Sequence, residues 1–372
     1  MRFFKTAALH TALICSIASG AHATTMYTVL GLGDLPGGGS FSQAFGVSDN
    51  GQVTGRSRAT TGDRAFRWTE SGGMQDLGDL PGGNDFSEGW GINDRGEVAG
   101  FSLASTGFRA FRWTESGGMQ DLGDLPGGSN FSLSYRINQS GQIAGYSSAL
   151  TGNRAFRWTE GVGLQDLGEL PGGSNSSQAF GINDRGDVAG WSGASTGIRA
   201  IRWTESDGMQ DLGDLPGGED LSFAYAINEN GDVAGWSGAS TGNRAFRWTE
   251  SGGMQDLGDL PGGDDLSLAF GINDQGQIVG RSSATSGNRA FLWDGVHGLQ
   301  DLNDLIDTAA GWVLTEAWDI NSSGQIAGTG IGPSGFREAF LLTPTAVIPV
   351  PPALPMLLAG VLGLGLCRRR RA

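Results

Sequence analysis

Cysteine, lysine and histidine are all scarce in this chain. Its 372 residues include two cysteines, Cys15 and Cys367, and both lie close to the ends. The long middle of the chain therefore has neither a disulfide nor a thiolate metal site. Beyond the first 23 residues the one histidine is His297. This argues against a histidine metal cluster and a Ser-His-Asp triad, and favours a surface turn for His297.

Basic residues are also few between the two ends of the chain. Arg2, Lys5 and the arginines at 368–371 are six of the 24 basic residues, so 18 arginines face 39 acidic residues and give a net charge of −21. Such a surface repels nucleic acid and anionic membranes, and we expect no nucleic-acid partner. Cations, glycans and basic proteins stay possible partners.

No segment shows a sustained helical period, and glycine follows no strict triplet. The 66 glycines and 12 prolines are therefore not those of collagen, and the interspersed apolar residues exclude simple disorder. Repetitive all-β proteins of this length often fold as one unit.

The first 23 residues have the pattern of a secretory signal. Arg2 and Lys5 form a basic start, an apolar stretch follows, and Ala21-His22-Ala23 is a small-x-small end. We expect cleavage before Thr24 and export of the protein.

An internal period of 45 residues runs through the middle of the chain. Three kinds of position repeat: the proline of a Leu-Pro-Gly-Gly motif, a tryptophan and an isoleucine. They are Pro36, Pro81, Pro126, Pro171, Pro216 and Pro261; Trp68, Trp113, Trp158, Trp203, Trp248 and Trp293; and Ile92, Ile137, Ile182, Ile227 and Ile272, with Val47 before and Ile320 after.

Turn signals divide each repeat into four short strands. In the second copy we predict strands at 89–93, 97–103, 109–115 and 119–125, separated by turns at 94–96, 105–107 and 116–118. Asx-Gly and Ser/Thr-Gly pairs suit tight turns, and we expect 93–96 to be an Asx turn. The loop at 126–128 leads to the next copy, because proline cannot donate within a central strand. We call this loop the inter-blade loop. We call the turn between the second and third strands of a blade the middle turn.

Four-stranded units of this length predict an all-β fold, a seven-bladed β-propeller. Six complete copies are flanked by residues 27–35, which match a fourth strand, and by residues 318–342, which supply the other three. The N-terminal strand would pair with the C-terminal strands and close the ring. We expect the propeller to occupy residues 24–344; the alternative is an open β-solenoid.

The repeat body resembles the HAF family of extracellular bacterial repeats. The resemblance covers roughly residues 27–342 and is carried by segments such as Gln43-Ala44-Phe45 and Arg64-Ala65-Phe66-Arg67-Trp68. It implies an exported repeat protein and no particular activity.

The composition changes abruptly in the tail, residues 345–372. Ile348, Pro349, Val350 and Pro351 are followed by an apolar run over 353–367 and by Arg368, Arg369, Arg370 and Arg371. We predict a short transmembrane helix with its arginines on the cytoplasmic side. The tail resembles PEP-CTERM sorting signals of Gram-negative bacteria, with Val350 where that pattern has Glu. The resemblance implies cleavage by an exosortase-like enzyme; a retained membrane anchor is the alternative.

Charged and aromatic residues recur once in each blade. Arginines 64, 109, 154, 199, 244, 289 and 337 are matched by acids at 34, 79, 124, 169, 214, 259 and 304, and seven copies favour a repeated structural ion pair over catalysis. Aromatic residues at 45, 90, 135, 180, 225, 270 and 318 are expected to be core, packed between blades. A second set, Arg56, Phe101, Tyr146, Trp191, Trp236 and Arg281, favours packing, with stacking on sugars or peptides as the alternative.

The inter-blade loops and middle turns of a propeller emerge on one face, and we place the candidate binding residues there. They are Asn84, Asp85, Phe108, Ile198, Glu219, Asp220, Asp264 and Asp265. Repetition predicts several weak, multivalent sites for a polymer, and the paired acids suit a calcium bridge. The competing hypothesis is one site in the central channel near Arg136 and Asp319, which interrupt an otherwise small position.

Together these features favour a non-enzymatic binding scaffold, secreted or at the surface of a Gram-negative bacterium. The tail would anchor it at least transiently in the inner membrane. Its partner would be a polysaccharide, for instance of a biofilm matrix, or a surface protein. The alternative is an extracellular glycan hydrolase, although no carboxylate pair in the sequence stands out for that chemistry.

Overall fold

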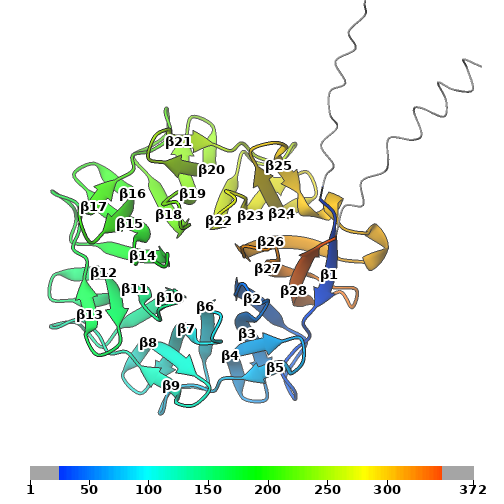
Figure 1. Cartoon of the computed structure of the whole chain (residues 1–372), viewed down its shortest axis with the longest axis horizontal. Coiled ribbons are helices and arrows are strands. Elements are labelled where there is room, and N and C mark those ends of the chain that lie inside the picture. Colours follow the sequence, from blue (N-terminus) through cyan, green and yellow to red (C-terminus); the bar gives the residue numbers. More distant parts are fainter. Residues whose placement is uncertain (1–24, 346–372) are drawn as a thin grey trace, which may run out of the picture. The chain divides into compact units, whose positions relative to one another are not determined.

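A computed structural model describes residues 25–345, and Met26–Thr345 form one compact unit. Seven four-stranded antiparallel sheets, the blades, are arranged as a ring around a central axis (Figure 1). This confirms the predicted seven-bladed β-propeller.

The strands are numbered in chain order. Blades 1 to 3 contain β2 (Ser42–Val47), β3 (Val53–Ala59), β4 (Gly62–Thr69), β5 (Gly73–Asp76), β6 (Ser87–Ile92), β7 (Val98–Ala104), β8 (Gly107–Thr114), β9 (Gly118–Asp121), β10 (Ser132–Ile137), β11 (Ile143–Ala149), β12 (Gly152–Thr159) and β13 (Gly163–Asp166). Blades 4 to 6 contain β14 (Ser177–Ile182), β15 (Val188–Ala194), β16 (Gly197–Thr204), β17 (Gly208–Asp211), β18 (Ser222–Ile227), β19 (Val233–Ala239), β20 (Gly242–Thr249), β21 (Gly253–Asp256), β22 (Ser267–Ile272), β23 (Ile278–Ala284), β24 (Gly287–Asp294) and β25 (Gly298–Asp301). Blade 7 contains β26 (Val313–Ile320), β27 (Ile326–Ile331), β28 (Arg337–Pro344) and β1 (Tyr27–Gly31), and it is preceded by the 3-10 helices η1 (Leu302–Leu305) and η2 (Thr308–Ala310).

Blade 7 closes the ring as predicted. β1 pairs antiparallel with β28, in register from Tyr27 opposite Pro344 to Gly31 opposite Phe340. The N-terminal strand thereby covers the edge that β28 would otherwise expose.

The fourth strands are shorter than predicted. The strand expected at 119–125 ends at Asp121, because the Asp121 carboxylate accepts a 2.8 Å hydrogen bond from the backbone N–H of Gly123. Gly123 has φ 84°, a left-handed conformation that glycine adopts without strain and that turns the chain out of the sheet.

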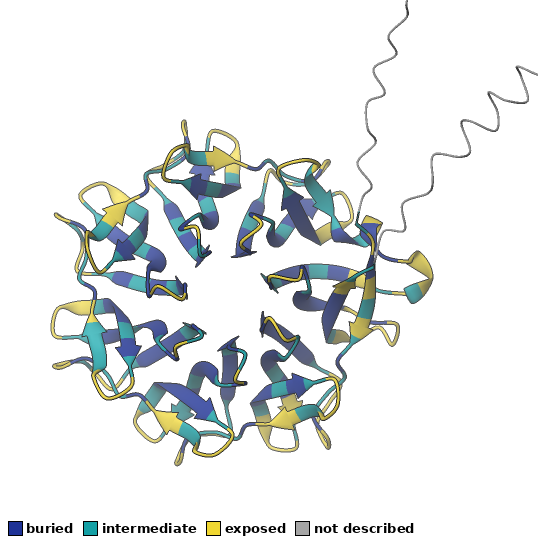
Figure 2. Cartoon of the chain, viewed as in Figure 1, coloured by how far each residue is buried: buried dark blue, intermediate teal, exposed yellow. Residues whose placement is uncertain are grey.

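The hydrophobic core lies between neighbouring blades. One cluster joins Ala65 and Leu77 of blade 1 to Ile92, Phe111 and Trp113 of blade 2, and equivalent clusters recur around the ring. Figure 2 shows the inner strands largely buried and the outer turns exposed. Each blade therefore buries apolar side chains against its neighbours, as expected of a repeat architecture.

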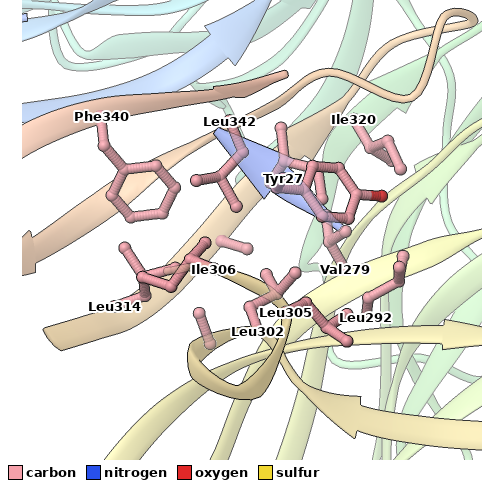
Figure 3. Close-up of a cluster of buried hydrophobic side chains, with 13 residues drawn as sticks. Tyr27, Val279, Leu292, Leu302, Leu305, Ile306, Leu314, Ile320, Phe340 and Leu342 are labelled. Carbon is pink, nitrogen blue, oxygen red and sulfur yellow. The ribbon is translucent and has the colours of Figure 1, made fainter. Parts of the chain in front are cut away.

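The joint between blades 6 and 7 is built by the two chain ends. Tyr27 packs among residues of β23, β24, η1 and β26–β28 (Figure 3). Burial, with the negative charge of Asp294, raises the pKa of the Tyr27 phenol to about 12. The phenol therefore stays neutral inside this core over the physiological pH range.

Candidate functional site

A β-bulge at an aromatic residue recurs in all seven innermost strands, and β26 has a second bulge at Thr315. In each innermost strand the register shifts around one aromatic residue, for example Phe45 between Ala44 and Gly46 in β2. A bulge interrupts the alternation of a strand and re-aims the extra side chain. The bulged residues are Phe45, Trp90, Tyr135, Phe180, Tyr225, Phe270 and Trp318, which we call the aromatic collar.

The rings of the aromatic collar contact one another all the way round. Phe45 stacks on Trp90 and Phe270 on Trp318, with ring centroids 4.3 Å apart in both pairs. Trp318 also meets Phe45 edge-on at 5.5 Å, which joins blade 7 to blade 1. Such pairs add stabilisation beyond their buried area.

The collar surrounds a cavity of about 370 Å³, which we call the basin. Its lining consists of the collar together with Phe101, Arg136, Leu268 and Arg281. Phe45 and Phe270 are buried, whereas the other five collar residues are half-buried. The expectation of packing between blades is thus correct, but the collar also presents aromatic surface to the basin.

Arg136, which lines the basin, forms an ion pair with Asp319. Their side chains approach to 3.3 Å, from blades 3 and 7. Arg136 also donates to the backbone carbonyls of Phe45, Trp90 and Trp318 at 3.0, 3.0 and 3.3 Å. We call this pair the axial plug. Burial raises the pKa of Asp319, although the charge of Arg136 acts to lower it.

The plug stands where other blades have a small residue. A Cβ added to Gly91 would lie 2.7 Å from the Cα of Arg136, so the backbones pack too closely there for larger side chains in most blades. The structure brings Arg136 and Asp319 together, as the competing hypothesis of one central site requires. Ligand binding at that place stays a prediction.

On the other side of the plug is a polar cavity of about 190 Å³. It is lined by the turns between first and second strands, which carry a ladder of asparagines. Asn138 Nδ2 donates to the carbonyl of Asn183 at 2.9 Å, and the same bond links Asn93, Asn183, Asn228, Asn273 and Asn321 to the next blade. The predicted Asx turn at 93–96 is confirmed by a bond from the Arg95 N–H to Asn93 Oδ1.

The second set of repeated positions, on the second strand of each blade, has an aromatic part and a charged part. The second-strand residues Phe101, Tyr146, Trp191 and Trp236 are half-buried. Arg56 pairs with Glu88 at 2.5 Å and Arg281 with Glu316 at 3.0 Å. Arg281 lines the basin, whereas Arg56 lies outside its lining. Packing and partial exposure therefore coexist at this second set of positions.

Arg281 acts on the titration of a collar residue. Burial raises the pKa of Tyr225, and a hydrogen bond with Trp236 and the charge of Arg281 oppose that rise. The guanidinium is thus close enough to the basin to influence a group on its wall.

The predicted apolar site residues are partly packed. Phe108 meets Phe86, Phe101 and Phe131 with centroids 5.9, 5.8 and 6.5 Å apart, so its ring belongs to an aromatic cluster leading toward the collar. The backbone N–H of Ile198 donates to the carbonyl of Asp220 at 3.0 Å, and Ile198 is half-buried.

The predicted acidic site residues divide into bound and open ones. Asp85, Asp220 and Asp265 each form an ion pair with the third-strand arginine of the preceding blade, at 2.6, 2.8 and 2.9 Å. Asn84, Glu219 and Asp264 are exposed. In the part of the chain that the structure describes, no three histidine, cysteine or acidic side chains gather as a metal-binding group. A calcium bridge stays a prediction.

The repeated ion pair is confirmed in five blades. Its arginines are 64, 109, 154, 199 and 244, and its acids are 79, 124, 169, 214 and 259. Their regular geometry, copied around the ring, supports the structural interpretation of these charges.

The same prediction is wrong at the joint. Arg289 turns to Asp301 at 3.8 Å, because Asp304 lies in η1. Arg337 pairs instead with Glu316 at 2.7 Å. The position equivalent to the other arginines holds Glu338, whose pKa is raised by burial and by the charge of Asp34.

His297 lies in an exposed turn, as expected, with Nδ1 3.0 Å from Asp294. The predicted signal and the sorting residues of the tail lie outside the described residues. Among residues 25–345, no helix is both long and apolar enough to cross a membrane.

Sequence reasoning missed the basin, although it had identified all seven collar residues. The signal that points to it is an aromatic residue followed by a small one on each innermost strand, interrupted at Arg136 and Asp319. Comparison with known proteins supplies no function, because no family model matches the chain and no curated protein matches its sequence.

Proposed function

We propose that the propeller is a non-enzymatic glycan-binding module, and that the basin holds one or two sugar residues of an extracellular polysaccharide. The observation that carries this proposal is the closed aromatic collar around a cavity of about 370 Å³. Ligand pockets of roughly 300–1,000 Å³ lined by aromatic side chains and a few polar groups are typical binding sites.

The size of the basin supports a ligand of one or two rings. A cavity of about 150 Å³ holds one benzene molecule, so the basin has room for roughly two six-membered rings. The C–H faces of a sugar ring are apolar and stack on aromatic side chains, while its edge hydroxyls need polar partners. Half-buried Tyr135 and Tyr225 of the collar offer both kinds of surface.

Binding is favoured over hydrolysis by the chemistry of the walls. A glycoside hydrolase needs two carboxyl groups facing the scissile bond. The basin lining contains two arginines and no carboxylate. The acids beside it, Glu88 and Glu316, are buried in ion pairs with arginines.

The cellular setting follows from the ends of the sequence. The signal pattern of residues 1–23 and the proline, apolar and arginine segments of the tail support export, processing by an exosortase-like enzyme and a position at the cell surface. These assignments, with the HAF and PEP-CTERM resemblances, form part of the proposal.

The test is binding of the full chain to an array of bacterial polysaccharides and short oligosaccharides, with reducing ends measured in parallel. Phe180 contacts its neighbours in the collar at 4.9 and 5.0 Å, and F180A removes that wall. Truncation of a central anchor costs about 2 kcal/mol or more, so affinity should fall at least about 30-fold. F336A is the matched control, because Phe336 is exposed and lies outside the basin lining.

Two results would overturn the proposal: no binding to any glycan, or equal binding by wild type and F180A. Release of reducing ends would favour the hydrolase. A single basin also predicts equal molar affinity for short and long oligomers, whereas a strong gain with chain length would favour the repeated inter-blade loops.

A further inference from the structure

Two residues that line the basin carry a hydrogen-bond donor without an acceptor. The donors are Nε of Arg281 on β23 and Nε1 of Trp318 on β26; both atoms are buried and, within residues 25–345, have no hydrogen-bond partner. A buried donor without a partner costs about 1–3 kcal/mol, and more when it carries charge, so a ligand that supplies acceptors there gains binding energy.

Blade 1 contains the same arginine with its donors satisfied. Arg56 occupies in β3 the position that Arg281 occupies in β23, and its Nε and Nη2 donate to Gln43 Oε1 at 2.9 and 2.6 Å. The register partner of Arg281 at the equivalent place is Leu268, which offers no acceptor. The sequence difference between Gln43 and Leu268 therefore leaves the Arg281 donor open.

The charge balance also differs between these two arginines. Arg56 and Glu88 form a neutral pair. Glu316 is instead shared between Arg281 at 3.0 Å and Arg337 at 2.7 Å, so two cations face one carboxylate. The cluster carries a net charge of +1 in a body that is otherwise strongly acidic.

Arg136 does not provide a comparable site. Its guanidinium is already bound to Asp319 and three backbone carbonyls. The Arg281 side chain as a whole is 31% exposed, although its Nε atom is buried. An anion entering the basin therefore meets Arg281, and the cationic lining disfavours a cationic ligand despite the aromatic walls.

From these observations we propose that the basin selects a uronic acid residue, a sugar ring whose carboxylate binds Arg281 and Trp318 while its ring stacks on the collar. This inference rests on the proposed glycan-binding function and specifies its ligand class. Arginine presents its nitrogen donors in the planar arrangement that a carboxylate accepts.

The test compares trigalacturonate and tri-mannuronate with their carboxyl-reduced counterparts, by calorimetry on the full chain. We expect R281Q to weaken uronate binding about 10- to 100-fold, the range for a hydrogen bond to a charged group, and to leave binding of the reduced sugars unchanged. R56Q is the matched control and should leave uronate binding within about 2-fold of wild type.

A second variant tests the same donor without removing Arg281, and so covers the case that R281Q does not fold. L268Q reproduces the blade 1 arrangement and supplies an internal acceptor to Arg281, so it should weaken uronate binding while keeping every charge. Equal affinity of wild type for uronates and reduced sugars, or equal loss on both in R281Q, overturns the uronate assignment but leaves glycan binding in place. Preference for a peptide with a free C-terminal carboxylate over uronates also overturns it. Loss of all sugar binding in F180A supports the proposed glycan-binding function. It does not decide between uronates and reduced sugars.

Discussion

Arg136 and Asp319 can each be replaced by glycine, the residue that most other blades have at this position. The free energies of unfolding of these variants measure how strongly the stabilisation by one residue depends on the other. R136G leaves the Asp319 carboxylate with only the N–H groups of Val47 and Ile320, at 3.0 and 3.1 Å. Removing one partner of a fully buried ion pair costs about 3–5 kcal/mol, and this is an upper bound here because the two side chains are 18% and 20% exposed. With about 2.1 cal/mol/K of unfolding entropy per residue over the roughly 320 residues of Met26–Thr345, the loss lowers Tm by at most about 5–7 °C.

The double variant R136G/D319G should lose far less than the sum of the single variants. It leaves no uncompensated charge and restores the glycine of blades 1, 2, 4 and 6 at Gly46, Gly91, Gly181 and Gly271, so we expect a coupling free energy of about 3 kcal/mol. Thermal unfolding of all four proteins by circular dichroism measures this. If the loss of stability in the double variant equals the sum of the two single losses, Arg136 and Asp319 do not depend on each other and the argument is wrong.

The same cycle has a pH signature. Burial raises the pKa of Asp319, so its folded-state carboxyl binds a proton more tightly than in the unfolded chain. The contribution of the Asp319 carboxyl to the free energy of unfolding is fully present below its ordinary pKa. It is lost as the pH rises through the raised pKa. The deficit of R136G should therefore shrink near pH 4, and a deficit that does not change with pH would contradict the argument.

Three further predictions concern ring closure, the asparagine ladder and acid stability. Deleting residues 27–35 removes β1 and exposes the edge of β28, so the whole ring should melt earlier and aggregate; an unchanged cooperative transition would argue against closure by β1. S48N supplies the missing ladder donor toward the carbonyl of Asn93 and should stabilise by about 1 kcal/mol in urea unfolding; no gain would show that the ladder ends at Ser48 for a steric reason. Although burial raises the pKa of Glu97, bonds from Arg95, Asn93 and Arg112 lower it to about 2, so its stabilisation is present above pH 4.5 and lost as pH falls toward 2. E97Q should flatten stability over that window, and an unchanged acid slope would contradict it.

Much of the fold could be predicted because its information is local and repeated. Glycine and Asx turns set the strand lengths to within a few residues, and the matching of residues 27–35 to a fourth strand predicted which chain ends meet. The repeated arginine and acid pairs were predicted correctly where neighbouring copies are alike. At the joint the prediction was wrong, because η1 displaces Asp304 and Glu338 takes the arginine position.

The sequence by itself determined the number of blades, their strand order and the closure of the ring, since each follows from the 45-residue period and its two partial copies. Only the tertiary structure decided how the collar is used: bulges turn one aromatic side chain per blade toward the basin, and a bulge depends on how two strands pair. The meeting of Arg136 with Asp319 and the open donor of Arg281 beside Leu268 were decided there too. Residues far apart along the chain become neighbours only when the ring brings their blades around one axis.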